Sequence, residues 1–170
     1  MILGMSIPAF TLLHVALSLV GILAGLVVVA AMLGAKYNSG WTALFLATTI
    51  LTSATGYLFP VDKVLPSHIV GAISLVVLAI AAVALYSFPL MGAWRWVYVA
   101  SATFALYLNV FVLVAQAFLK VGFLKSLAPT GSEPPFLIAQ GVVLIAFVLL
   151  GIKALKSFRP DTNRGALRPA

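Results

Sequence analysis

Five apolar runs, each long enough to cross a lipid bilayer as a helix, occupy most of this chain. A spanning helix needs about 20 consecutive apolar residues, and none of the runs contains an acidic residue. Three runs begin at a proline, where the missing N–H has no helical partner to lose: Pro8, Pro66 and Pro135. We therefore predict an all-α, polytopic membrane helix bundle with about five transmembrane helices, at 8–34, 41–60, 66–88, 94–119 and 135–155.

The composition agrees with burial in lipid. The chain is 64% hydrophobic and 8% charged, whereas a soluble domain is about half apolar and about a quarter charged. The absence of cysteine excludes disulfides, thiolate metal sites, iron–sulfur clusters and covalently attached c-type haem. The sequence also contains no GxSxG or HExxH motif and no pair of carboxylates within a span, so we do not expect an enzyme.

The basic residues predict an orientation. Five spans place the two termini on opposite sides, and the positive-inside rule then favours N-out, C-in. The inner face would hold seven basic residues and the outer face three: Lys36, Arg95, Lys153, Lys156, Arg159, Arg164 and Arg168 against Lys63, Lys120 and Lys125. We predict a bundle over 1–158 and a basic cytoplasmic tail over 159–170, and we expect anionic lipid headgroups, not nucleic acid, as the partner of these charges.

Small residues and tryptophans indicate how the helices pack. Residues four apart on a helix lie on one face, and small residues at this spacing let two helices approach closely. Two such faces are present: Gly21 and Gly25, and Thr48, Thr52 and Gly56. All three tryptophans fall at the predicted inner boundary, where such rings anchor spans: Trp41, Trp94 and Trp96. We expect the long 120–134 connection to lie partly on the outer surface as a cap.

The strongly polar side chains gather at one depth of the predicted bundle. Counting helical turns from each boundary places both histidines and both glutamines in its outer half, with a tyrosine at the outer end of the second span and an asparagine reaching mid-membrane: His14, His68, Gln116, Gln140, Tyr57 and Asn109. Polar groups at lipid depth are costly unless partnered, and they often line cavities or ligand pathways. Two interpretations follow: an outward-facing polar cavity, or side chains that pair with one another to lock the bundle.

Four stretches resemble segments of a family of small multispanning proteobacterial inner-membrane proteins to which no function is assigned. They are LTSATGYLFP, PSHIVGAISL, YLNVFVLVAQAF and APTGSEPPFLIAQ. The resemblance covers most of the chain after residue 40 and implies a multi-pass protein of the bacterial inner (cytoplasmic) membrane. It includes Tyr57, His68, Asn109, Glu133 and Gln140 but not His14, which weakens any scheme that needs both histidines.

The leading functional hypothesis is a non-catalytic accessory subunit of a larger bacterial membrane complex of the respiratory or photosynthetic type, with an outer-leaflet polar pocket. Short loops, small-residue faces and a basic tail are typical of such a subunit, and its partners would be membrane lipids and other membrane subunits, or further copies of the chain.

The alternative hypotheses give the polar layer a ligand. His14 and His68 could ligate a b-type haem, with Gly21 and Gly71 making room for the macrocycle. A quinone or lipid headgroup could instead bind to His68 or Tyr57, with both glutamines as further donors. A transition-metal site that adds Glu133 to the two histidines is the weakest signal.

Overall fold

The computed structural model describes residues 1–61 and 65–159, and these residues form an all-helical bundle. The prediction of an all-α fold is confirmed. Five long helices and one short helix follow one another in this described part of the chain: α1 (Ile7–Leu33), α2 (Ser39–Gly56), α3 (Pro66–Tyr86), α4 (Gly92–Lys120), α5 (Gly122–Leu127) and α6 (Pro134–Ser157). The five long helices correspond to the five predicted runs.

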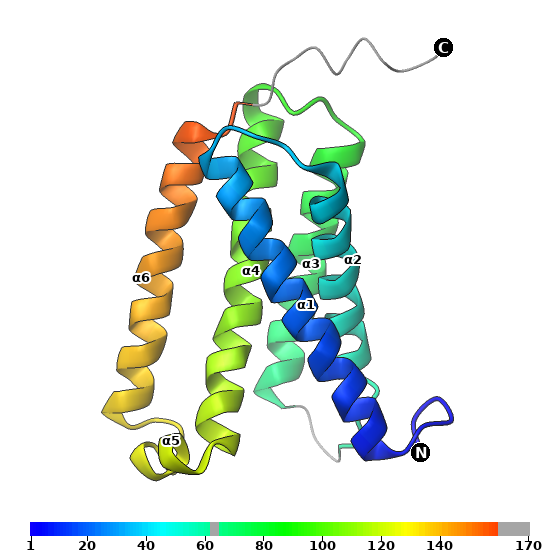
Figure 1. The fold of residues 1–170 in the computed structure, drawn as a ribbon, viewed down its shortest axis with the longest axis vertical. Coiled ribbons are helices and arrows are strands. Elements are labelled where there is room, and N and C mark those ends of the chain that lie inside the picture. Colours follow the sequence, from blue (N-terminus) through cyan, green and yellow to red (C-terminus); the bar gives the residue numbers. More distant parts are fainter. Residues whose placement is uncertain (62–64, 160–170) are drawn as a thin grey trace.

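Consecutive long helices run in opposite directions, so the bundle has two distinct ends (Figure 1). We call the end where α1, α3 and α6 begin the histidine end, because His14 lies about two turns into α1 and His68 lies in the first turn of α3. We call the other end the tryptophan end, because the three tryptophans lie in the first turns of α2 and α4. The helices α1 to α4 pack around one another, and α6 lies at the edge of the bundle against α4.

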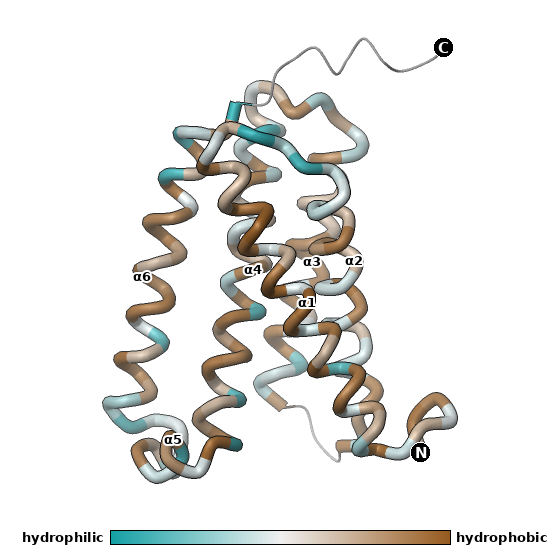
Figure 2. The backbone as a smooth tube through the Cα atoms, in the orientation of Figure 1, coloured by the Kyte–Doolittle hydropathy of each residue, from teal (hydrophilic) through white to brown (hydrophobic). Residues whose placement is uncertain are grey.

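Four helices are long and apolar enough to cross a membrane: α1, α3, α4 and α6. The second predicted span, 41–60, corresponds to α2, which is 18 residues long and is not among these four helices. Its hydroxyl side chains lower its hydropathy. Figure 2 shows the overall pattern, with apolar residues along the helices and hydrophilic residues mainly at the two ends of the bundle.

The helices begin where the sequence provides a cap or a proline. Ser6 Oγ accepts a hydrogen bond from Ala9 N at the start of α1, and Asn38 Oδ1 accepts one from Trp41 N at the start of α2. Prolines occupy the first turn of α1, α3 and α6, as predicted. Each cap satisfies a backbone donor that the helix leaves unpaired.

α1 crosses α2 and α4 at its two glycines. A Cβ atom added at Gly25 would lie 2.6 Å from Leu106 Cδ1 and 2.8 Å from Phe45 Cε2, and one at Gly21 would lie 3.1 Å from Thr49 Oγ1. Side chains of α2 and α4 therefore fill the space that each glycine leaves. The predicted small-residue face of α1 is the contact that brings the three helices together.

The half of the bundle nearer the tryptophan end contains the hydrophobic core. Its largest fully buried side chains include Tyr98, Phe45 and Phe158. Arg95 joins α4 to the end of α6, because its guanidinium donates to the carbonyl of Leu155 at 3.1 Å and to that of Phe158. This end of the bundle is closed by both packing and hydrogen bonds.

The connection between α4 and α6 contains the short helix α5, at the histidine end (Figure 1). The prediction that this connection is more than a simple turn is confirmed. Of the predicted basic tail, all but Arg159 lies outside the described residues, as does Lys63.

Candidate ligand-binding site

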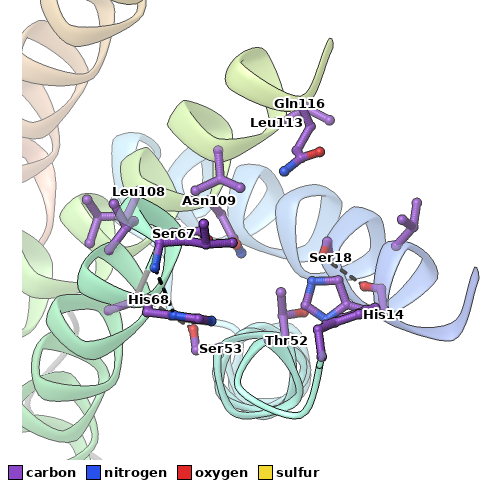
Figure 3. A pocket seen from close by; sticks show the side chains of 18 of the residues that line it. His14, Ser18, Thr52, Ser53, Ser67, His68, Leu108, Asn109, Leu113 and Gln116 are labelled. Atoms are coloured by element: carbon purple, nitrogen blue, oxygen red, sulfur yellow. Dashed lines mark hydrogen bonds between the residues drawn. The ribbon is translucent and has the colours of Figure 1, made fainter. Parts of the chain in front are cut away.

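A cavity of about 690 Å³ lies in the histidine half of the bundle, enclosed by α1, α2, α3 and α4. Ligand pockets in proteins have typical volumes of about 300–1,000 Å³. Five of the six predicted site residues line this cavity: His14, Tyr57, His68, Asn109 and Gln116. In Figure 3 the two imidazoles face the same opening from α1 and α3, with Thr52 and Ser53 of α2 between them.

His68 uses one ring nitrogen to cap its own helix. It lies in the first turn of α3, and its Nδ1 accepts a hydrogen bond from the backbone N–H of Leu65 at 3.2 Å. A nitrogen that accepts an N–H carries no proton, so the neutral ring carries its proton on Nε2. The nitrogen that remains available to a ligand is therefore a hydrogen-bond donor.

Tyr57 holds His68 in place. The two rings are stacked with centroids 5.4 Å apart, and the Tyr57 hydroxyl donates to the backbone carbonyl of His68 at 2.6 Å. The tyrosine ring also fills the space beside Gly71, where an added Cβ would lie 3.3 Å from the hydroxyl oxygen. Tyr57 thus fixes the orientation of the imidazole, and its own hydroxyl proton is already engaged.

His14 has the opposite arrangement. Its Nδ1 lies 2.8 Å from Thr55 Oγ1, and the Thr55 hydroxyl donates its single proton to the carbonyl of Leu51 at 2.7 Å. With the hydroxyl proton directed to this carbonyl, or to that of Thr52 at 3.2 Å, the threonine oxygen accepts from His14, which assigns the imidazole proton to Nδ1. In the neutral ring, Nε2 of His14 keeps its lone pair and is a hydrogen-bond acceptor.

The two histidines therefore offer complementary groups to one cavity. The ligand-facing nitrogen of His68 donates, and that of His14 accepts. This pair suits a molecule that carries both a carbonyl and a hydroxyl group. Each assignment follows from the partner that lies within hydrogen-bonding distance of Nδ1, which is Leu65 N for His68 and Thr55 Oγ1 for His14.

α4 supplies two amides to the cavity. Gln116 is half-buried, its side chain makes no hydrogen bond within the described residues, and its amide points into the cavity in Figure 3. Asn109 lies deeper, and its Nδ2 donates to Thr49 Oγ1 at 3.3 Å. Gln116 is therefore available to a ligand, whereas Asn109 ties the floor of the cavity to α2. Lys120, at the last position of α4, also lines the cavity.

Serines on α2 and α3 complete the polar lining. Ser53 donates to Ser74 Oγ at 3.1 Å, and Ser67 also lines the cavity. Sequence reasoning missed both serines of α3. The spacing could have found Ser74, because His68, Gly71 and Ser74 recur at three-residue intervals and thus fall on neighbouring parts of one helix face.

Gln140 is separated from the other predicted site residues. It lies on α6, is buried against α4, and its Nε2 donates to the carbonyl of Phe111 at 3.0 Å. Its Oε1 is buried with no partner in the described part of the chain. Gln140 therefore anchors α6 to α4, and it does not pair with Gln116.

The polar layer does not assemble the three-residue metal site. Among residues 1–61 and 65–159, no group of three His, Asp or Glu side chains could hold a metal ion. Glu133 is engaged in its own loop, where it accepts from Thr130 N at 2.9 Å, from Thr130 Oγ1 at 2.9 Å and from Ser132 N at 3.0 Å. These hydrogen bonds, the backbone one from Thr130 foremost, lower the pKa of Glu133 to about 2.

The fold and composition define a multi-pass membrane protein with a polar cavity near one end of its helices. No family model, curated protein or solved structure matches this chain.

Proposed function

We propose that this membrane protein binds the ring of a quinone-type ligand in the cavity between α1 and α4. The observation that carries the proposal is the pair of hydrogen bonds at Nδ1 of His14 and Nδ1 of His68, because the tautomers assigned from them offer an acceptor and a donor to one ligand. In the quinol form of the ligand, one ring oxygen would accept from Nε2 of His68, and the hydroxyl on the other side of the ring would donate to Nε2 of His14. The oxidised form, which has only carbonyls, would use the His68 donor alone. The half-buried Gln116 amide supplies a further donor or acceptor.

The same geometry favours a quinone over a b-type haem. Axial ligation of haem through Nε2 needs a free lone pair on that nitrogen in both histidines. In His68 this nitrogen carries the proton, and moving the proton to Nδ1 would leave Leu65 N–H without its acceptor. The two glycines that would make room for the macrocycle, Gly21 and Gly71, are covered by threonine and tyrosine side chains.

Two asparagine variants test the proposal while preserving the structural hydrogen bonds. In His68→Asn, the amide oxygen replaces Nδ1 as the acceptor for Leu65 N–H, and the cavity loses its donor. In His14→Asn, the amide nitrogen replaces Nδ1 as the donor to Thr55, and the cavity loses its acceptor. We expect each variant to weaken quinone binding by about three- to tenfold, the usual value of one hydrogen bond.

The measurement is equilibrium binding of a tritiated benzoquinol, kept reduced, to the protein in lipid nanodiscs, with mass spectrometry of any co-purifying quinone. Gln140→Leu is the matched control, because it removes an amide of the same half of the bundle that lies outside the cavity. Unchanged quinone affinity in both asparagine variants would refute the proposal.

We further propose that the chain crosses the bacterial inner membrane five times, with the histidine end outside. The alternating helix directions support five crossings, and the 18 residues of α2 extend about 27 Å, close to the thickness of the hydrocarbon core. The tryptophans and the larger share of basic residues favour the tryptophan end as the cytoplasmic face. A cysteine at Ala170 should resist an impermeant thiol reagent in intact cells, and its rapid labelling would overturn this orientation.

A second candidate function is the non-catalytic accessory subunit of a larger respiratory or photosynthetic type complex. The position of α6 favours it, because this helix packs mainly along α4 and leaves large apolar side chains uncovered, among them Leu137, Ile138 and Ile145. Other subunits, or a second copy of the chain, would cover this face. Purification from native membranes in mild detergent tests the hypothesis, and a single-chain particle that keeps its quinone would count against it.

A further inference from the structure

Four seams surround the cavity, each the line along which two neighbouring helices meet. Hydrogen bonds and ring contacts bridge two of these seams. Between α1 and α2, His14 binds Thr55 and the rings of Phe10 and Phe59 lie 5.1 Å apart. Between α2 and α3, Ser53 donates to Ser74, and the Tyr57 hydroxyl is bonded to the backbone of α3. These contacts bridge both seams beside the cavity.

The helices α3 and α4 pack against each other more extensively than α1 and α4 do. Ser74 of α3 and Leu108 of α4 both line the cavity, and both side chains are buried. One turn further toward the tryptophan end, Leu78 is fully buried in the hydrophobic core. Figure 3 shows Leu108 beside α3, on the His68 side of the cavity.

The seam between α1 and α4 is different. The two helices meet where Gly21 approaches Asn109 and where Gly25 approaches Leu106, and from this crossing they diverge toward the histidine end (Figure 1). Within the described residues, no hydrogen bond or ring contact joins them there. The cavity is therefore a wedge whose apex is the glycine crossing and whose open side lies between α1 and α4.

Apolar, exposed side chains from both helices line this open side. Leu19 of α1 is 43% exposed and Leu113 of α4 is 41% exposed, and both belong to the cavity wall. Val15, one turn from Leu19, is exposed as well and also lines the cavity. The polar interior of the cavity thus continues into an apolar slot that faces the lipid.

We infer that this slot is a lateral portal for a lipid tail, so that the ligand is an amphiphilic quinone whose ring enters the cavity while its alkyl or prenyl tail remains between α1 and α4 in the leaflet at the histidine end. The inference rests on the proposed function, because the same ring-binding histidines hold the head of the ligand. An apolar tail in contact with leucine, valine and lipid requires no hydrogen-bond partner, whereas the ring oxygens reach the donors and acceptors inside. A water-soluble ligand would make no use of the slot.

Tryptophan substitutions in the slot test the portal. Leu19→Trp and Leu113→Trp narrow it from its two sides. Leu12→Trp and Leu119→Trp are matched controls on the same two helices, because both leucines are exposed and neither lines the cavity. Binding is measured in nanodiscs with two tritiated probes, a benzoquinone that carries a prenyl tail and the same ring with a methyl group in its place.

We expect both slot variants to weaken binding of the tailed quinone by about tenfold, and to leave the affinity for the tail-less ring within about twofold. The control variants should change neither affinity. An equal loss for both probes would overturn the inference, since the leucines would then shape the ring site. No loss for either probe would also overturn it and would leave the proposed function intact. If the unmodified protein binds neither probe, the proposed function itself fails.

A second measurement locates the tail directly. A tailed quinone with a diazirine in the first part of its tail should label peptides of α1 and α4 upon illumination. Exclusive labelling of α3 or α6 would overturn the portal even if the affinities behave as expected.

Discussion

The two halves of this bundle use the same helices in opposite ways. In the tryptophan half, the side chains of α1 to α4 fill the space between the helices, and large rings such as Tyr98 and Phe158 are fully buried. In the histidine half, the same four helices enclose a cavity of about 690 Å³. Close packing throughout would be the usual state of a protein interior, so the cavity is the feature that needs a functional explanation.

The difference has a physical origin in the glycines of α1. Gly21 and Gly25 let α1 approach α2 and α4 closely at one level, and a straight helix that crosses its neighbours at one level must diverge from them at another. In the histidine half, several hydroxyls bond to their own helix: Thr11 donates to Ile7 O and Ser18 to His14 O. Because these hydroxyls donate to carbonyls of α1 itself, they form no hydrogen bond that would draw α1 toward α4.

The largest expected effect comes from breaking the crossing that separates the halves. In Gly25→Val, the new side chain would lie closer to Leu106 and to the ring of Phe45 than van der Waals contact allows. We therefore expect a loss of about 3 kcal/mol in the free energy of unfolding. Thermal unfolding in detergent measures it. Gly141→Val, where an added Cβ meets nothing within 4 Å, is the control. Equal stability of the two variants would show that the close contact is not required.

A smaller effect is expected from loosening the closed end. Arg95→Leu removes the hydrogen bonds to the carbonyls of Leu155 and Phe158. Because Arg95 is half-buried and partly screened by solvent, we expect a cost of about 1 kcal/mol and faster amide hydrogen exchange at the end of α6, with quinone binding unchanged. Arg159→Leu, an exposed neighbour, should leave exchange as it is. Unchanged exchange in Arg95→Leu would show that these hydrogen bonds do not hold the end of α6 against α4.

The smallest effect concerns the loop at the histidine end. Hydrogen bonds lower the pKa of Glu133 from 4.5 to about 2, so folding favours the carboxylate. Its contribution to loop order is complete above pH 4.5 and is lost as the pH falls through about 2. The Thr130 amide resonance, followed by NMR against pH, should titrate with a midpoint near 2, and Glu133→Gln should abolish this titration. A midpoint near 4.5 would mean that the loop does not hold the carboxylate.

Much of this arrangement could be predicted from residue types and spacing. Helical rise converts sequence position into depth, so counting turns from each apolar boundary placed five polar residues at the level where the structure has its cavity. The prolines at helix starts and the glycine face of α1 have local causes, and both predictions are confirmed. Depth along a helix is largely a local property.

The rotation of a helix about its own axis is not a local property. Gln116 and Gln140 were expected at a similar depth, yet one points into the cavity and the other packs α6 onto α4. The helix α6 is apolar on all sides, so its sequence has no periodicity that would orient it. The proton positions on His14 and His68 also depend on neighbours, Thr55 and Leu65, whose distances only the fold determines.

The predicted second span shows a similar limit at a helix end. The apolar run extends to Pro60, whereas α2 ends at Gly56. Beyond it, Phe59 turns onto the rings of Phe10 and His14, with centroids 5.1 and 5.3 Å away. A hydrophobic run predicts burial, but it does not distinguish a last helical turn from a turn that folds back onto the neighbouring helix.

The glycine crossing limits the paths by which a ligand could enter and leave the cavity. In the described part of the chain, Ile22 is the last residue of α1 that lines the cavity. One turn further along α1, the side chains of Leu106 and Phe45 fill the space beside Gly25. The cavity therefore does not continue toward the tryptophan end. On the proposed function, a ligand that enters between α1 and α4 would have to leave from the same half of the bundle, and this cavity would hold or exchange it on one side of the bilayer without carrying it across.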